Sequence, residues 1–130
     1  MVGQRGRILC AEDNADTRDL ISVILTAAGF EVVCTERGDE ALELARSQRF
    51  HLYLIDNWMP GLSGTELVMK LREFDVRTPI LFYSGNETDK EVARLAGAQG
   101  YLVKPVASDD LIAEIARLIG EDRNASDQSI

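Results

Sequence analysis

Five polar side chains in this sequence each stand where a short apolar run stops. They are the acidic pair Glu12 and Asp13, the single acid Asp56, the hydroxyl of Ser84 and the amine of Lys104. A carboxylate can attack phosphorus and form an acyl phosphate. An amine and a hydroxyl can hold the oxygens of the phosphoryl group during transfer. These residue types together suit phosphoryl transfer, with Asp56 as the nucleophile.

The three acids also predict a metal. Carboxylates held close together repel one another and raise at least one pKa, so they need a cation nearby. Lys104 supplies one positive charge, and the remaining hard oxygen ligands suit Mg²⁺, which binds through one or two carboxylates and bridges to phosphate oxygens. The alternative is that Glu12 and Asp13 simply cap the helix that follows them.

Short aliphatic runs alternate with helical patterns along the whole chain, which indicates repeated strand-helix units and a parallel sheet. The five predicted strands span residues 7–11, 31–35, 52–56, 80–84 and 101–103. The apolar runs do not alternate with polar residues, as expected for strands covered by helices on both faces. All the polar candidates therefore lie at carboxyl ends of strands, the edge where open α/β sheets bind ligands.

Five helices are predicted between and after these strands, over residues 16–28 and 39–47, from Ser63, from Thr88, and from Ser108 to Gly120. Ser63 and Thr88 each have a glutamate three residues later, which is the spacing of a capping box.

Apolar spacing predicts which helix residues face inward. In the first helix these are Leu20 and Ile24, with Gly29 as a C-terminal cap. In the fourth, Val92 and Leu95 follow the start signal.

Length and composition bound the possible functions. The chain has 130 residues, enough for one ordinary domain, and its apolar fraction of 45% is that of a globular protein. No apolar segment approaches the ~20 residues that span a bilayer, and the N-terminus lacks a secretion signal, so we expect a cytoplasmic protein without a membrane partner. The net charge of −8 opposes direct DNA binding.

The remaining reactive residue types give little support to other chemistry. We expect Cys10 and Cys34 to be free thiols inside strands. His51 is the only histidine, so a multi-histidine metal site or a histidine-dependent triad has no support.

Residues 8–14, residues 54–61, Ser84-Gly85 and Lys104-Pro105, in this order and spacing, resemble the receiver domain of two-component response regulators, the chemotaxis regulators included. The resemblance covers residues 7–119. It implies an α/β fold with a five-stranded parallel sheet in the order 2-1-3-4-5, flanked by five helices in a flavodoxin-like, doubly wound arrangement. We expect a receiver domain over residues 7–120, with flexible termini at 1–6 and 121–130.

The resemblance also assigns roles, each at a matching position of this sequence. It implies that Asp56 accepts a phosphoryl group from a histidine kinase or a phosphotransfer protein, with Mg²⁺, or Mn²⁺ in its place, as cofactor. The implied metal ligands are Asp13 directly, Glu12 through water, Asp56, and the backbone carbonyl of Trp58. Ser84 and Lys104 would bind the phosphate, Ser84 and Tyr101 would form the switch, and Lys104-Pro105 would be a cis peptide.

The implied activity is a signalling switch and not a general enzyme, since such a domain catalyses only its own phosphorylation and slow dephosphorylation. Phosphorylation would change the surface of the fourth helix, fifth strand and fifth helix. We expect that surface, including Arg94, Tyr101 and Asp109, to contact a downstream protein or a second copy in a phosphorylation-dependent dimer. The chain reads as a single-domain regulator or phosphorelay intermediate.

Two departures and two alternatives stay open. Trp58 and Asn86 stand two residues after Asp56 and Ser84, positions that shape water access, so the phosphoryl lifetime is not predicted. Phosphatases of the haloacid dehalogenase type also use an aspartate nucleophile but carry a second aspartate where this chain has Trp58. The other alternative is an interaction module that is never phosphorylated. Tyr101 could also serve only in packing.

Overall fold

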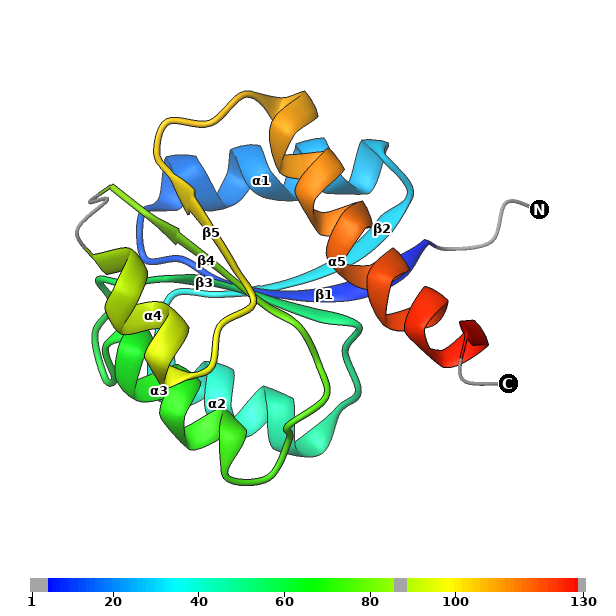
Figure 1. The fold of residues 1–130 in the computed structure, drawn as a ribbon. Coiled ribbons are helices and arrows are strands. Elements are labelled where there is room, and N and C mark those ends of the chain that lie inside the picture. The colour runs from blue at the N-terminus through cyan, green and yellow to red at the C-terminus, as the bar shows by residue number, and fades with distance from the viewer. Residues whose placement is uncertain (1–4, 86–88, 129–130) are drawn as a thin grey trace.

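The chain folds as a parallel five-stranded sheet covered by helices on both faces (Figure 1). This computed structural model describes residues 5–85 and 89–128. The strands are β1 Gly6–Ala11, β2 Phe30–Thr35, β3 Leu52–Asp56, β4 Ile80–Ser84 and β5 Gly100–Val103. Their order is β2-β1-β3-β4-β5, which confirms the predicted flavodoxin-like α/β fold.

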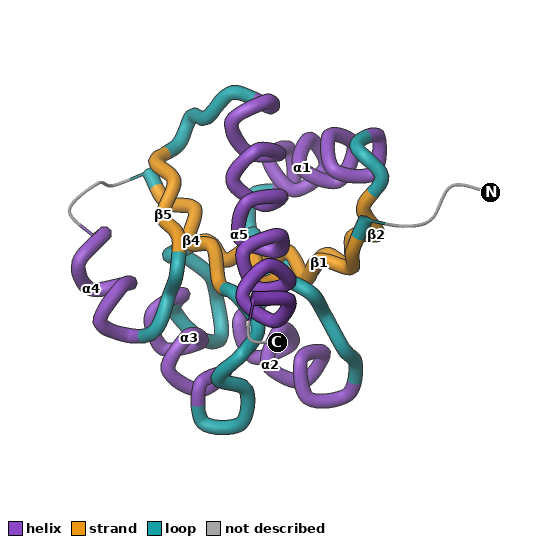
Figure 2. The backbone as a smooth tube through the Cα atoms, turned by 45° about the vertical axis from the view of Figure 1, so that its right-hand side comes forward, coloured by secondary structure: helices purple, strands orange, loops and turns teal. Residues whose placement is uncertain are grey.

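The helices are α1 Ala15–Ala27, α2 Gly38–Ser47, α3 Gly64–Arg72, α4 Lys90–Ala96 and α5 Ser108–Gln128. Helices α1 and α5 cover one face of the sheet, and α2, α3 and α4 cover the other (Figures 1 and 2). Each strand therefore feeds a helix that returns over the sheet, as the strand-helix alternation predicts.

The core divides into two layers because successive side chains of a strand point to opposite faces. In β3, Tyr53 and Ile55 pack with α2 and α3, whereas Leu52 and Leu54 pack with α1 and α5. All of β3 is buried. The central strand therefore has apolar contacts on both faces, which fixes its carboxyl end, and with it Asp56, in the middle of the sheet edge.

Helix boundaries follow the sequence signals in several places. Ser63 accepts a hydrogen bond from the backbone N–H of Glu66, whose carboxylate accepts from the backbone N–H of Ser63, so the predicted capping box is present. Gly29 has φ +102°, the left-handed conformation expected of a residue that terminates α1. The box predicted at Thr88, like Asn86, lies outside the described residues.

The predicted inward face is partly right in α1, where Ile24 packs against the core, and wrong in α4. Leu20 of α1 is 59% exposed, and the residues that α1 buries are Ile21 and Leu25. In α4, Ala93 is buried whereas Val92 and Leu95 are exposed. Each of these segments carries apolar residues on more than one face, so apolar spacing alone does not choose the face that meets the sheet.

The predicted end of the last helix at Gly120 is also wrong, because α5 continues to Gln128. Gly120 is not among the glycines with positive φ. A glycine in a helix interior costs only about 1 kcal/mol relative to alanine, which a helix anchored by buried residues such as Ile115 tolerates. The expected flexibility of residues 121–130 stays a prediction.

The two cysteines are free and lie on neighbouring strands, where Cys10 and Cys34 are register partners. A membrane-spanning helix, long and apolar throughout, is not found in the part of the chain that the structure describes.

Candidate functional site

The acids and the lysine singled out in the sequence meet at the carboxyl edge of the sheet. Lys104 Nζ lies 2.7 Å from Glu12 Oε1 and 3.2 Å from Asp56 Oδ1. Carboxylate oxygens of Glu12, Asp13 and Asp56 lie within 4.8 Å of one another. Glu12 and Asp56 are buried and Asp13 is exposed, so the cluster opens to solvent on the Asp13 side.

The loop after β3 holds Asp56 through a close backbone approach. Gly64 N donates to Asn57 O at 2.8 Å. A Cβ at Gly64 would stand 2.4 Å from the backbone oxygen of Asp56, so only glycine fits there. The start of α3 is thereby packed directly under the end of β3, which keeps the Asp56 carboxylate in place.

The pKa of Asp56 is raised from its ordinary 3.8 to about 7, chiefly by burial and then by the nearby Glu12 carboxylate, while Lys104 acts in the opposite direction. Burial acts in the opposite sense on Lys104, but its hydrogen bond to Glu12 and the charges of both acids outweigh that effect and raise its pKa. The two buried carboxylates thus share one ammonium group, which leaves the cluster with more negative than positive charge.

This donor set fits a divalent cation. Three carboxylates from two neighbouring strand ends supply hard oxygen ligands, one of them on the solvent side where waters can complete the coordination. Glu12 Oε2 already accepts a hydrogen bond from Asn14 N at 3.1 Å, so this carboxylate is anchored by its own loop. Glu12, Asp13 and Asp56 could together hold Mg²⁺.

Ser84 ends β4, and Tyr101 lies on the neighbouring edge strand β5. Ser84 is fully buried, and its hydroxyl donates to Asp89 Oδ2 at 3.4 Å. Tyr101 is partly buried and stacks on Phe82, with ring centroids 5.7 Å apart and planes at 17°. Tyr101 therefore has the packing contact that was considered for it.

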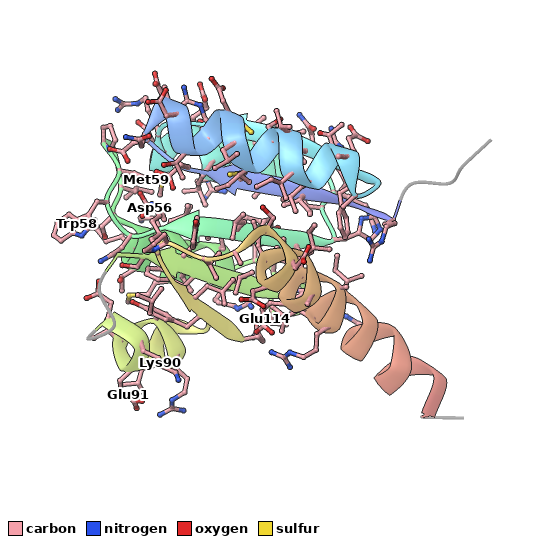
Figure 3. All side chains as sticks on the ribbon, turned by 90° about the horizontal axis from the view of Figure 1, so that it is seen from above. Asp56, Trp58, Met59, Lys90, Glu91 and Glu114 are labelled. Atoms are coloured by element: carbon pink, nitrogen blue, oxygen red, sulfur yellow. The ribbon has the colours of Figure 1, made fainter. Side chains whose placement is uncertain are left out.

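The other predicted residues are placed as follows. Trp58 points away from the molecule and is 71% exposed, whereas Asp56 lies inside the same edge (Figure 3). The peptide bond between Lys104 and Pro105 is cis. Arg94 and Asp109 are exposed and lie on α4 and α5, outside the acidic cluster.

Three supporting residues were not found from the sequence. Asn57 Nδ2 donates to Asp89 Oδ2 at 2.7 Å, so the loop after β3 is tied to the start of α4. Arg18 Nη1 donates to the backbone oxygen of Glu12 at 3.0 Å and so supports the acidic pair from α1. Asn57 stands next to Asp56 and could have been noticed, but nothing in the sequence connects Asp89 or Arg18 with this edge.

A family model described as the response regulator receiver domain matches residues 8–116 of the chain. Among curated proteins, the cell cycle transcriptional regulator CtrA of Caulobacter vibrioides is 35% identical over 115 residues, which are 87% of this chain and 50% of that protein. The transcriptional regulatory protein YrkP of Bacillus subtilis is 37% identical over 111 residues, 84% of this chain and 47% of that protein. The chain spans about half the length of these curated relatives.

Solved structures show the same fold. A CheY-like receiver domain protein from Methanospirillum hungatei has a TM-score of 0.88 and 27% identity, covering 95% of this chain and 99% of that one. The receiver domain of the sensor histidine kinase PA1611 from Pseudomonas aeruginosa has a TM-score of 0.84 and 31% identity, covering 92% and 99%. That structure has a magnesium ion coordinated in its active-site cleft.

Proposed function

Since this chain belongs to the response regulator receiver domain family of two-component signalling, we propose that Asp56 is its phosphoacceptor and that phosphorylation switches its binding surface. The observation that carries the proposal is the buried Asp56 carboxylate, held 3.2 Å from Lys104 beside Glu12 and Asp13. A phosphohistidine of a histidine kinase or phosphotransfer protein is the donor.

The chemistry follows from the charges. An Asp56 oxygen attacks the phosphorus, the bond from phosphorus to the donor's histidine nitrogen breaks, and the nitrogen keeps the electron pair. Only the ionised carboxylate attacks, and with a pKa of about 7 Asp56 is ionised in only part of the molecules at neutral pH. Mg²⁺ bound by Asp13, Asp56 and the Trp58 carbonyl, with Glu12 through water, would supply positive charge for both carboxylate and phosphoryl oxygens.

Lys104 then changes partners. Its ammonium now bridges Glu12 and Asp56, and the phosphoryl oxygens replace the Asp56 carboxylate as its acceptor. The hydroxyl of Ser84 donates to another phosphoryl oxygen and gives up Asp89, its present acceptor. Because Asp89 begins α4, this exchange is transmitted to the start of that helix.

The output is a change in binding at α4, β5 and α5. Tyr101 turns from its present stack on Phe82 as Ser84 moves, and the surface with Arg94 and Asp109 contacts a downstream protein or a second copy. The domain catalyses only its own phosphorylation and slow dephosphorylation. It acts in the cytoplasm, where the kinase is supplied with ATP, and contacts neither membrane nor DNA directly.

Phosphorylation by a small-molecule donor tests the proposal. With acetyl phosphate and Mg²⁺, intact mass should rise by one phosphoryl group, and the fluorescence of the exposed Trp58, two residues from Asp56, should change. Asp56→Asn should abolish both responses, and Asp109→Asn, which alters an exposed acid of α5, should leave them intact. Absence of phosphorylation while a known receiver is modified in parallel would favour the unphosphorylated interaction module.

A further inference from the structure

A second concave site lies at the opposite edge of the sheet, at the amino ends of β3 and β4. Its cavity of about 640 Å³ opens to solvent and is lined by the end of α2 and by the connections that lead into β3 and β4. Small-molecule sites commonly measure about 300–1,000 Å³. The cavity shares no lining residue with the acidic cluster around Asp56, so the phosphoacceptor site does not account for it.

The wall of this cavity at Asp75 is rigidly built. The Asp75 carboxylate accepts from the Tyr53 hydroxyl at 2.7 Å and the Thr78 hydroxyl at 2.6 Å, and also from the backbone N–H groups of Arg77 and Thr78 at 3.1 and 3.0 Å. Arg72 donates to the Asp75 backbone oxygen at 2.8 Å. The one carboxylate of the lining is thus held in place by donors of its own loop and of β3, and its single negative charge is outnumbered by the arginines that line the cavity.

Three arginines stand around the opening: Arg46, Arg49 and Arg77. Arg46 has one distant ion pair, at 3.9 Å from an exposed Glu43 carboxylate, which contributes little in water. Among the side chains that the structure describes, no ion pair is found for Arg49 or Arg77. On a chain of net charge −8, a rim of three arginines facing one cavity favours a ligand with phosphate oxygens, which guanidinium groups bind in a bidentate manner.

The lining also offers an aromatic side chain. Phe74 is 44% exposed, and the Arg46 guanidinium lies 5.4 Å from its ring centroid.

We propose that this cavity binds a nucleoside monophosphate, with the phosphate on the arginine rim and the base against Phe74. Guanidinium groups and an exposed aromatic ring are together the recognition elements for an anionic group attached to a planar ring. The site is independent of Asp56 and gives the domain a second input.

Calorimetric titration of the full chain with adenosine monophosphate tests this, alongside adenosine and inorganic phosphate. We expect the monophosphate to bind at least tenfold more tightly than either part, and more weakly as salt is raised. Equal affinity for inorganic phosphate would show a general anion patch and overturn the nucleotide proposal. No heat at millimolar monophosphate would overturn the site altogether.

Variants locate the binding. Arg49→Ala with Arg77→Ala should weaken binding at least tenfold, and Phe74→Ala should weaken it severalfold while leaving inorganic phosphate unaffected. Arg94→Ala is the matched control, because it removes an exposed arginine of α4 that pairs with Glu91 and is remote from the cavity. Circular dichroism and thermal unfolding check that each variant is folded. An equal loss in Arg94→Ala would contradict the proposed position.

Discussion

Two aspartates at opposite edges of the same sheet have pKa values on opposite sides of the ordinary 3.8. Asp56, at the carboxyl end of β3, has a pKa of about 7, whereas Asp75, before β4, has a pKa of about 2. Burial raises the pKa at both positions. At Asp75 the hydrogen bonds from Thr78, Tyr53 and the backbone outweigh burial, and at Asp56 the Glu12 carboxylate adds to it.

The difference in pKa reflects different roles of the two aspartates. Asp75 has four donors from its own neighbourhood and serves to fix the connection between α3 and β4. Asp56 shares one ammonium with Glu12, so its negative charge is only partly compensated. A carboxylate whose charge is only partly balanced is stabilised when a cation binds at the same edge. A carboxylate whose oxygens already accept hydrogen bonds from several donors gains little from a further partner.

The largest expected effect on stability comes from replacing Asp75, whose carboxylate accepts four hydrogen bonds. Asp75→Asn should lower the free energy of unfolding by about 3 kcal/mol at pH 7, since it loses the ionised acceptor and leaves Tyr53 and Thr78 poorly paired. The Asp75 contribution is present above about pH 4, where the unfolded chain is ionised, and is lost as pH falls toward 2. Urea titrations at several pH values measure it. If Asp109→Asn cost as much, the assignment to Asp75 would be wrong.

The second effect is the stabilisation that Mg²⁺ should give by binding to the acidic cluster around Asp56. Mg²⁺ at a hundredfold its dissociation constant should raise the free energy of unfolding by about 2.7 kcal/mol. Thermal unfolding with and without Mg²⁺ measures this. Asp13→Asn should shrink the shift at the same metal concentration, because it removes the exposed ligand of the cluster. An undiminished shift in that variant would place the metal elsewhere.

The third effect has the opposite sign to the first. Asp56→Asn should stabilise the metal-free protein by about 2 kcal/mol at pH 8, because it removes a buried, under-compensated charge. For the native chain, the folded state holds the Asp56 proton up to about pH 7 and the unfolded state releases it near 3.8, so stability falls as pH rises between these values. Urea titrations of both proteins from pH 5 to 8 should show this fall flattened in the variant. Equal slopes would contradict the raised pKa.

The smallest expected effect comes from removing one of the hydrogen-bond donors of Asp75, the hydroxyl of Thr78. Thr78→Val keeps the side-chain shape and removes the hydroxyl that lies 2.6 Å from Asp75, so we expect a loss of about 1 kcal/mol and a higher Asp75 pKa. Carboxylate titration by NMR measures the pKa, and urea unfolding measures the stability. Thr78→Ser retains the hydroxyl and should leave the Asp75 pKa near its native value.

Local signals in the sequence predicted local structure well. The capping box of Ser63 and Glu66 and the left-handed Gly29 are present as expected, because a helix end depends on residues within a few positions of it. The inward position of Leu20 was predicted wrongly, and α5 passes the predicted stop at Gly120. The first outcome depends on which side of α1 packs on the sheet, and the second on buried residues such as Ile115 that anchor α5, so both involve residues far away in the chain.

The sequence by itself determined which residues gather at the carboxyl edge. Apolar runs ending in Glu12, Asp56, Ser84 and Lys104 must bring these side chains to one edge once the strands pair in parallel, because all the strands then end there. The types of those residues already indicated phosphoryl chemistry.

Only the tertiary structure decided how strongly each acid holds its proton and where the second cavity lies. The sequence around Asp75 does not predict its hydrogen bond to Tyr53, which is 22 residues away, or the arginines that line the cavity beside it. A pKa is set by burial and by every charge and donor within a few ångströms. These neighbours come from separate parts of the chain, so their distances exist only after the sheet and helices have packed.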